Sequence, residues 1–128
     1  MQIELVDTPP VTPEHVPTGL MGTIRNADVV CVVVEAGEAA LDQVEMVLAV
    51  LNARGLALRP VARNELPAAD ASQRPGLIVA TKLDLASPGA LETLRELYAG
   101  RLPTVGVSAR IRQGLDDWFV RLWGLLAM

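Results

Sequence analysis

The sequence is poor in lysine and in aromatic residues. Of its 11 basic residues only Lys82 is a lysine, and the others are arginines. Two tryptophans, one tyrosine and one phenylalanine are the only aromatic residues in 128. The core therefore has to be built from Val, Leu, Ile and Ala. Runs of such aliphatic residues are typical of a parallel sheet that is covered on both faces.

Other absences exclude whole classes of protein. A single cysteine, Cys31, rules out an intrachain disulfide, and its place in an apolar run predicts an inert core residue. The net charge is −4 and no basic cluster occurs, so nucleic-acid binding has no electrostatic footprint. No apolar run reaches the roughly 18 residues of a membrane span, and the amino terminus lacks a signal-peptide pattern. We therefore expect a soluble, cytoplasmic protein without a membrane segment.

The apolar segments alternate between strand and helix patterns along a chain of single-domain length. Strands are expected over residues 2–6, 29–34, 56–61, 77–80 and 104–107, and helices over 18–25, 41–51, 88–100 and 115–126, with a surface loop over 63–75. Ser87 is expected as the N-cap of the third helix, and Pro88 as its first residue. This alternation predicts an α/β fold, a three-layer sandwich with a mainly parallel sheet.

Several conspicuous residues have plain structural explanations. The acidic positions Glu35, Glu38, Asp42 and Glu45 are expected to form a solvated helix start, which the helix dipole favours. His15 lies in a proline-rich loop and is expected to be solvated. The aromatic residues Trp118, Phe119 and Trp123 are expected to pack into the core from the C-terminal helix.

Three of the expected strands end in residues that can carry chemistry. They are followed by "DTPP" from Asp7, "TKLD" from Thr81 and "SA" from Ser108. Ligands of open α/β sheets bind beyond the carboxyl ends of the strands. Because the ends of parallel strands meet at one edge, the three segments are expected to converge on one ligand.

In this order, the three segments resemble the Asp-x-x-Gly, Asn-Lys-x-Asp and Ser-Ala motifs of the Ras-like P-loop GTPase superfamily. The stretch "LVDTPPVTPEHVPTGLMGTIRNADVVCVVVEAG" is most similar to the Obg/DRG-like branch of bacterial and archaeal GTPases. The resemblance covers residues 1–128 as one partial G domain, equivalent to the later two-thirds of such a domain. It implies the cofactors GTP or GDP and Mg²⁺.

The resemblance also implies roles for single residues. Asp84 would accept two hydrogen bonds from the edge of guanine, each strengthened by its charge. The stem of Lys82 would lie against the base and the sugar, where the planar fork of an arginine would not substitute well. The backbone of Ser108 and Ala109 would meet the guanine carbonyl, and Asp7 would face Mg²⁺ through water.

The chain departs from the family pattern in three places. Thr81 replaces the asparagine before the lysine, which weakens a bond to neighbouring loops. Pro10 replaces a glycine and has no N–H to donate to the γ-phosphate. No G-x-x-x-x-G-K-[ST] P-loop occurs, because the only lysine lies in "TKLD". The resemblance places that part before Met1, and the chain alone is not expected to hydrolyse GTP.

Two other functions stay open. One is a GTPase-like module without enzymatic activity that binds a partner protein, and the other is a flavodoxin-like domain for a different small ligand. The resemblance also has a consequence for assembly, because the strand that would separate residues 2–6 from 29–34 is absent. We expect either direct pairing of these two strands or self-association through the exposed edge.

Overall fold

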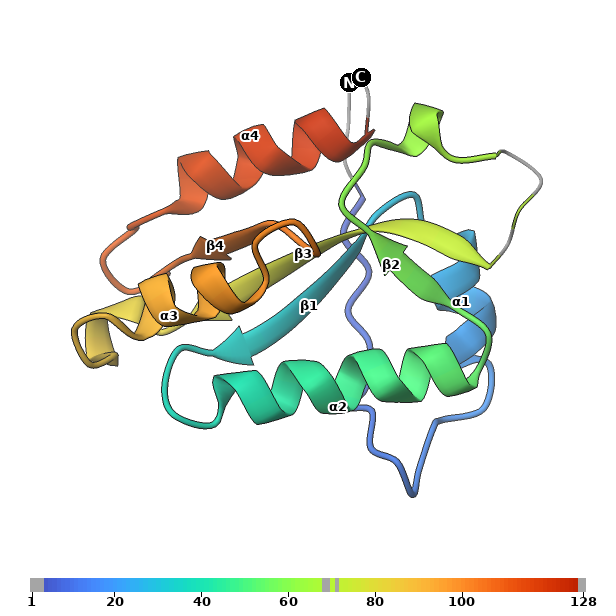
Figure 1. The fold of residues 1–128 in the computed structure, drawn as a ribbon, viewed down its shortest axis with the longest axis horizontal. Helices are drawn as coiled ribbons and strands as arrows, with labels where there is room; N and C mark the ends of the chain where they lie inside the picture. The colour runs from blue at the N-terminus through green and yellow to red at the C-terminus, as the bar shows by residue number, and fades with distance from the viewer. Residues whose placement is uncertain (1–3, 68–69, 71, 127–128) are drawn as a thin grey trace.

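The computed structural model describes residues 4–67, 70 and 72–126, and its strands form one open, fully parallel sheet (Figure 1). In chain order the helices and strands are α1 (Leu20–Asn26), β1 (Val30–Glu35), α2 (Ala40–Ala53), β2 (Ala57–Arg59), β3 (Gln73–Thr81), α3 (Ala90–Leu97), β4 (Thr104–Gly106) and α4 (Leu115–Leu126). Short 3₁₀ turns, η1 (Arg63–Glu65) and η2 (Leu83–Leu85), precede and follow β3.

The long strand β3 is the centre of the sheet. Its residues 78–80 pair with β1 and also with β4, so these two strands lie on opposite sides of it. The amide of Ile78 donates to the carbonyl of Pro103, and the amide of Ala57 donates to that of Ser72. Backbone groups alternate in direction along a strand. The even-numbered residues of β3 therefore face β4 and β2, which lie one after the other on the same side.

Helices cover both faces of this sheet, as expected for a three-layer α/β sandwich (Figure 1). On one face, Val32, Val34 and Ile78 pack against α2 and α3. On the other face, alternate residues of β3 and β4 pack against α4. The alternation of side chains along each strand supplies both faces with aliphatic residues. None of the helices in the described part of the chain is long and apolar enough to cross a membrane.

The expected strand over residues 2–6 is not found in the part that is described. Residues 4–6 are exposed and lie outside every strand, whereas residues 1–3 lie outside the described ranges. The exposed side chains include Leu5 and Val6, at 63% and 61%. A strand needs a neighbour for its backbone hydrogen bonds, and no other described strand pairs with these residues.

The loop expected over 63–75 is shorter, because β3 begins at Gln73 rather than at residue 77. Pro75 lies inside this strand, where it is fully buried. Odd-numbered residues of β3 face β1, since the amide of Ala36 donates to the carbonyl of Thr81. The β1 ladder starts only at the pair Val30 and Gly76. Pro75 therefore lacks an N–H at a position where the ladder does not use one.

Two helix predictions also need correction. The third helix begins at Ala90 after Gly89, whose φ of 85° is left-handed, so Ser87 is not its N-cap. On α4, Phe119 is 42% exposed and does not belong to the core. Trp118 packs against the sheet together with Leu125, as expected. These two positions are seven residues apart and therefore lie on one face of the helix.

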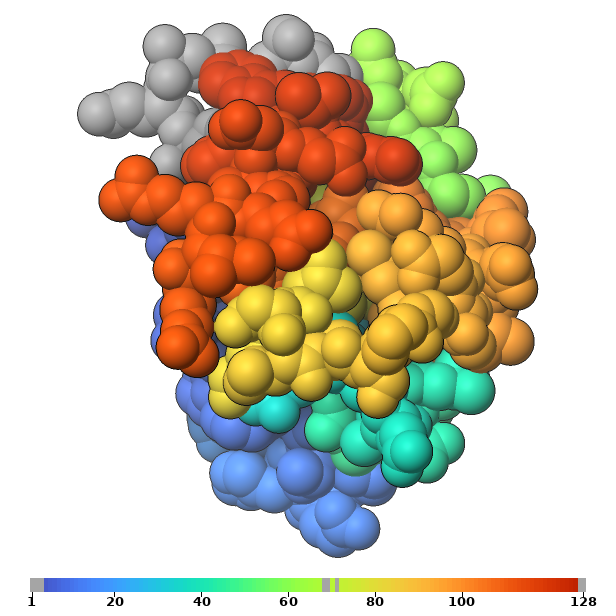
Figure 2. Space-filling model, turned by 90° about the vertical axis from the view of Figure 1, so that its left-hand side faces the viewer, coloured from blue at the N-terminus to red at the C-terminus, as the bar shows by residue number. Residues whose placement is uncertain are grey.

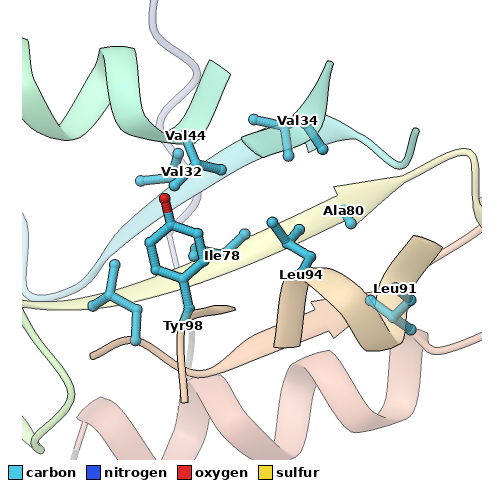
Figure 3. Close-up of a cluster of buried hydrophobic side chains, with 10 residues drawn as sticks. Val32, Val34, Val44, Ile78, Ala80, Leu91, Leu94 and Tyr98 are labelled. Atoms are coloured by element: carbon cyan, nitrogen blue, oxygen red, sulfur yellow. The ribbon is translucent and has the colours of Figure 1, made fainter. Parts of the chain in front are cut away.

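Tyr98 is the only aromatic residue at the centre of the larger core cluster (Figure 3). Its side chain is fully buried among Val32, Val44, Ile78 and Leu94 (Figure 3). The phenol hydroxyl donates a hydrogen bond of 2.5 Å to the Glu45 carboxylate at the edge of the cluster. Burial and, to a lesser extent, this carboxylate raise the pKa of Tyr98. A single side chain thus joins the end of α3 to α2 across the sheet face.

Truncating Tyr98 should therefore destabilise the fold in two separable steps. We expect Tyr98→Phe to lower the free energy of unfolding by about 1 kcal/mol, the usual worth of one hydrogen bond. Tyr98→Ala should cost about 3–5 kcal/mol, because it also leaves a cavity. Urea unfolding followed by circular dichroism measures both. Equal losses for the two variants would show that the ring contributes nothing to the core.

Candidate functional site

The carboxyl ends of β1, β3 and β4 lie at one edge of the sheet, as the parallel pairing requires. Figure 2 looks onto this edge. The yellow segment that follows β3 lies between the orange segment that follows β4 and the teal segment that follows β1 (Figure 2). The structure therefore brings together the "TKLD" and "SA" segments that the sequence placed at strand ends.

A direct side-chain contact joins these two segments. The Ser108 hydroxyl donates a hydrogen bond of 2.6 Å to Oδ1 of Asp84. Ser108 is fully buried, and two backbone hydrogen bonds of 2.9 and 3.0 Å tie it to Gln113. The amide of Leu83 donates to the carbonyl of Val107 at 3.0 Å. The carboxylate of Asp84 is thus held in place by a buried neighbour that is itself fixed by backbone hydrogen bonds.

Asp84 keeps free acceptor capacity in this arrangement. Each carboxylate oxygen has two lone-pair positions, and the Ser108 hydroxyl occupies one of them. The residue is half-buried, so it remains open to a ligand from one side. Ala109, which follows Ser108 in the chain, is exposed, and its N–H makes no hydrogen bond to another described residue. A carboxylate acceptor and a backbone donor therefore follow two adjacent strands.

Lys82 has an unusual backbone conformation at the end of β3. Its φ of 55° and ψ of 39° are left-handed, a conformation that costs a residue with a side chain on the order of 1–2 kcal/mol. Its ammonium donates a hydrogen bond of 2.7 Å to the Glu35 carboxylate at the end of β1. This hydrogen bond and the charge of Glu35 raise the pKa of Lys82, so the ammonium keeps its charge to a more alkaline pH than a free lysine does.

The part that Glu35 plays differs from the expectation of a solvated helix start. Glu35 ends β1 and pairs with Thr81 in the ladder. The hydroxyl of Thr81 also donates to the carbonyl of Val34 at 3.2 Å. The sequence does place Glu35 at the end of one strand and Lys82 just after the end of another. The contact between them can be inferred only once these two strands are known to pair.

Asp7 is not joined to this group. It is exposed in a segment outside every helix and strand, and no hydrogen bond or ion pair links it to another described residue. Within the described ranges, no group of three or more His, Cys, Asp or Glu residues is arranged to hold a metal ion. An ion at Asp7 would thus need most of its ligands from water and from a bound phosphate.

A groove of about 490 Å³ lies beside the same loops but is separate from these residues. It runs between the start of α3 and the segment before α4, and its charged lining residues are Glu92, Arg95 and Asp117. Lys82, Asp84 and Ser108 do not line it. The polar group at the strand ends is therefore a different surface from the groove.

Gly114 anchors the loop that carries Ser108. A Cβ at this position would lie 2.0 Å from the carbonyl oxygen of Gly106, and its φ is 77°. We expect Gly114→Ala to destabilise the fold by more than about 1 kcal/mol, because the backbone would have to shift. Gly124→Ala on α4 is the matched control, since it meets no atom and should stabilise the helix by about 0.5–1 kcal/mol. Urea unfolding of both variants tests this, and a neutral Gly114→Ala would contradict it.

No family model matches the chain, and no curated protein matches it.

Proposed function

We propose that this chain is the guanine-recognition part of an Obg/DRG-like GTPase domain. The observation that carries the proposal is the half-buried Asp84 carboxylate, held by Ser108 and lying two residues after Lys82. The order of the motifs along the chain and the parallel sheet that brings two of them together support the same reading. The phosphates would have to be held by groups outside this sequence, because it contains no P-loop motif.

The donor and acceptor pattern favours guanine over adenine. Guanine presents two adjacent N–H donors, and a carboxylate can accept from both with charge assistance. Its carbonyl is an acceptor, which suits the N–H of Ala109. Adenine has an acceptor at N1 and a donor at its 6-amino group, so it would set the lone pair of N1 against Asp84 and an amino group against the N–H of Ala109. Leaving such buried polar groups unpaired is the usual source of strong discrimination between bases.

In this proposal Lys82 contacts the nucleoside and Asp7 binds the metal ion. Glu35 holds the ammonium of Lys82, which leaves the aliphatic stem as the surface for the base and the sugar. Asp7 would hold Mg²⁺ through water, and the ion would neutralise charge on the phosphates. Pro10 cannot donate to a γ-phosphate, so the loop after Asp7 would not respond to it as a glycine does.

A module that binds a partner protein without nucleotide is the second candidate function. The proline at position 10 and the lack of a P-loop motif favour it, because both remove phosphate ligands. The two candidates differ in one measurable respect. Only the first requires the Asp84 carboxylate to discriminate between bases.

The chain alone should bind GDP and GTP very weakly. In GTPases of this kind the phosphates and Mg²⁺ supply most of the affinity, and this sequence lacks the lysine and backbone cradle that hold them. We expect no GTP hydrolysis above background. Titration calorimetry and a phosphate-release assay test this, and a sub-micromolar dissociation constant would contradict it.

Base recognition is tested by Asp84→Asn in a fusion protein that supplies a G-x-x-x-x-G-K-[ST] segment ahead of residue 1. The amide would turn a donor toward a donor of guanine, so GDP affinity should fall by about 1–3 kcal/mol. Xanthine carries a carbonyl at that place, so XDP should bind more tightly than before. Asp42→Asn, on the exposed start of α2, is the control and should change neither affinity. An unchanged preference in Asp84→Asn would remove the guanine assignment.

A further inference from the structure

β1 forms an edge of the sheet within the described part of the chain. Residues 30, 32 and 34 direct their backbone groups to β3, as the bond from Ala36 to Thr81 shows by alternation. The remaining residues, Cys31, Val33 and Glu35, direct their N–H and C=O groups away from β3. No described strand pairs with them. Three amides and three carbonyls thus form a row of open hydrogen-bonding groups.

This edge carries no proline, lysine or bulge, and Glu35 at its end is its only charged residue. Edge strands of stable monomers carry proline, lysine or a bulge, or they are covered by another element. β1 has the sequence VCVVVE, without proline or lysine, and it pairs with β3 in an unbroken register. Val33 is 61% exposed on the face that α4 covers over β3 and β4. The strand is therefore suited to pairing with another strand.

We propose that this edge is an interface between two copies of the chain, whose β1 strands pair antiparallel about Val33. The outward-facing residues form a set that is symmetric about its middle member. Val33 lies opposite Val33 of the second copy, and Cys31 lies opposite Glu35. In this register every outward N–H meets an outward C=O, as a two-fold interface requires.

The charges around β1 favour this register over the alternative. Glu35 is the only charged residue of the strand, and antiparallel pairing sets it beside an uncharged cysteine. A parallel two-fold pairing would have its axis along the strands, so each outward N–H of β1 would lie level with the same N–H of the second copy rather than with a carbonyl. Lys82 already holds Glu35 at 2.7 Å, and Arg63 holds Asp28, before the other end of the strand, at 2.7 Å. Both Glu35 and Asp28 therefore already have a basic partner within their own copy.

The assembly is tested by sedimentation equilibrium and light scattering on the full chain. We expect a concentration-dependent dimer that Val33→Lys weakens about tenfold or more, because a charge is placed on the two-fold axis. Val120→Lys is the matched control, since this valine on α4 is 70% exposed and should leave the dimer unchanged. Circular dichroism checks that both variants fold. A monomer at all concentrations, or equal effects of the two variants, would overturn the proposal.

The register is tested by disulfide formation. Residues directly opposite in a hydrogen-bonded antiparallel pair have Cα atoms about 5.5 Å apart, within the range that a disulfide spans. Under mild oxidation Val33→Cys should therefore give a covalent dimer, whereas the wild-type chain should not, because Cys31 lies opposite Glu35. Val120→Cys should also stay uncrosslinked. A covalent dimer of the wild-type chain through Cys31, or none from Val33→Cys, would overturn the pairing about Val33.

Discussion

The structure depends on the burial and double pairing of β3. Its residues 75–80 are all buried, and every other strand of the described sheet pairs with it. A strand covered on both faces has to be aliphatic throughout. Where the side chain of a neighbouring strand comes close to its backbone, it also needs a residue without a side chain. Gly76 meets the second need, because a Cβ there would lie 2.7 Å from that of Leu58. This strand sets the direction of the sheet and hence the edge at which Thr81, Lys82 and Asp84 emerge.

The candidate site is an extension of that pairing beyond the end of the strands. The amide of Val107 donates to the carbonyl of Ala80, and the amide of Leu83 then donates back to Val107. The contact of Ser108 with Asp84 continues the same line with side chains. A carboxylate held in this way needs little reorganisation to receive a ligand, which is the property that a specific base contact requires.

The contrast between the single lysine and the ten arginines has a counterpart in the structure. Arg74 donates to three carbonyls, those of Arg25, Asp70 and Gln73, and so joins α1 to the start of β3. A planar fork with several donors suits this task. Lys82 makes one short contact with Glu35 and leaves its aliphatic stem along the edge of the sheet. Arg74 therefore binds several carbonyls at the start of β3, and Lys82 binds one carboxylate just after its end.

The sequence by itself determined the buried strands, the parallel α/β class and the shared edge of "TKLD" and "SA". Those features follow from local periodicity and from the direction of parallel strands, both of which are visible in the residues. Tertiary structure alone decided that Pro75 lies in a strand, that residues 4–6 do not, and that Glu35 holds Lys82. Each of these depends on which backbone groups find a partner in another strand. Because that pairing joins residues far apart in the chain, such as Glu35 and Thr81, no local pattern contains it.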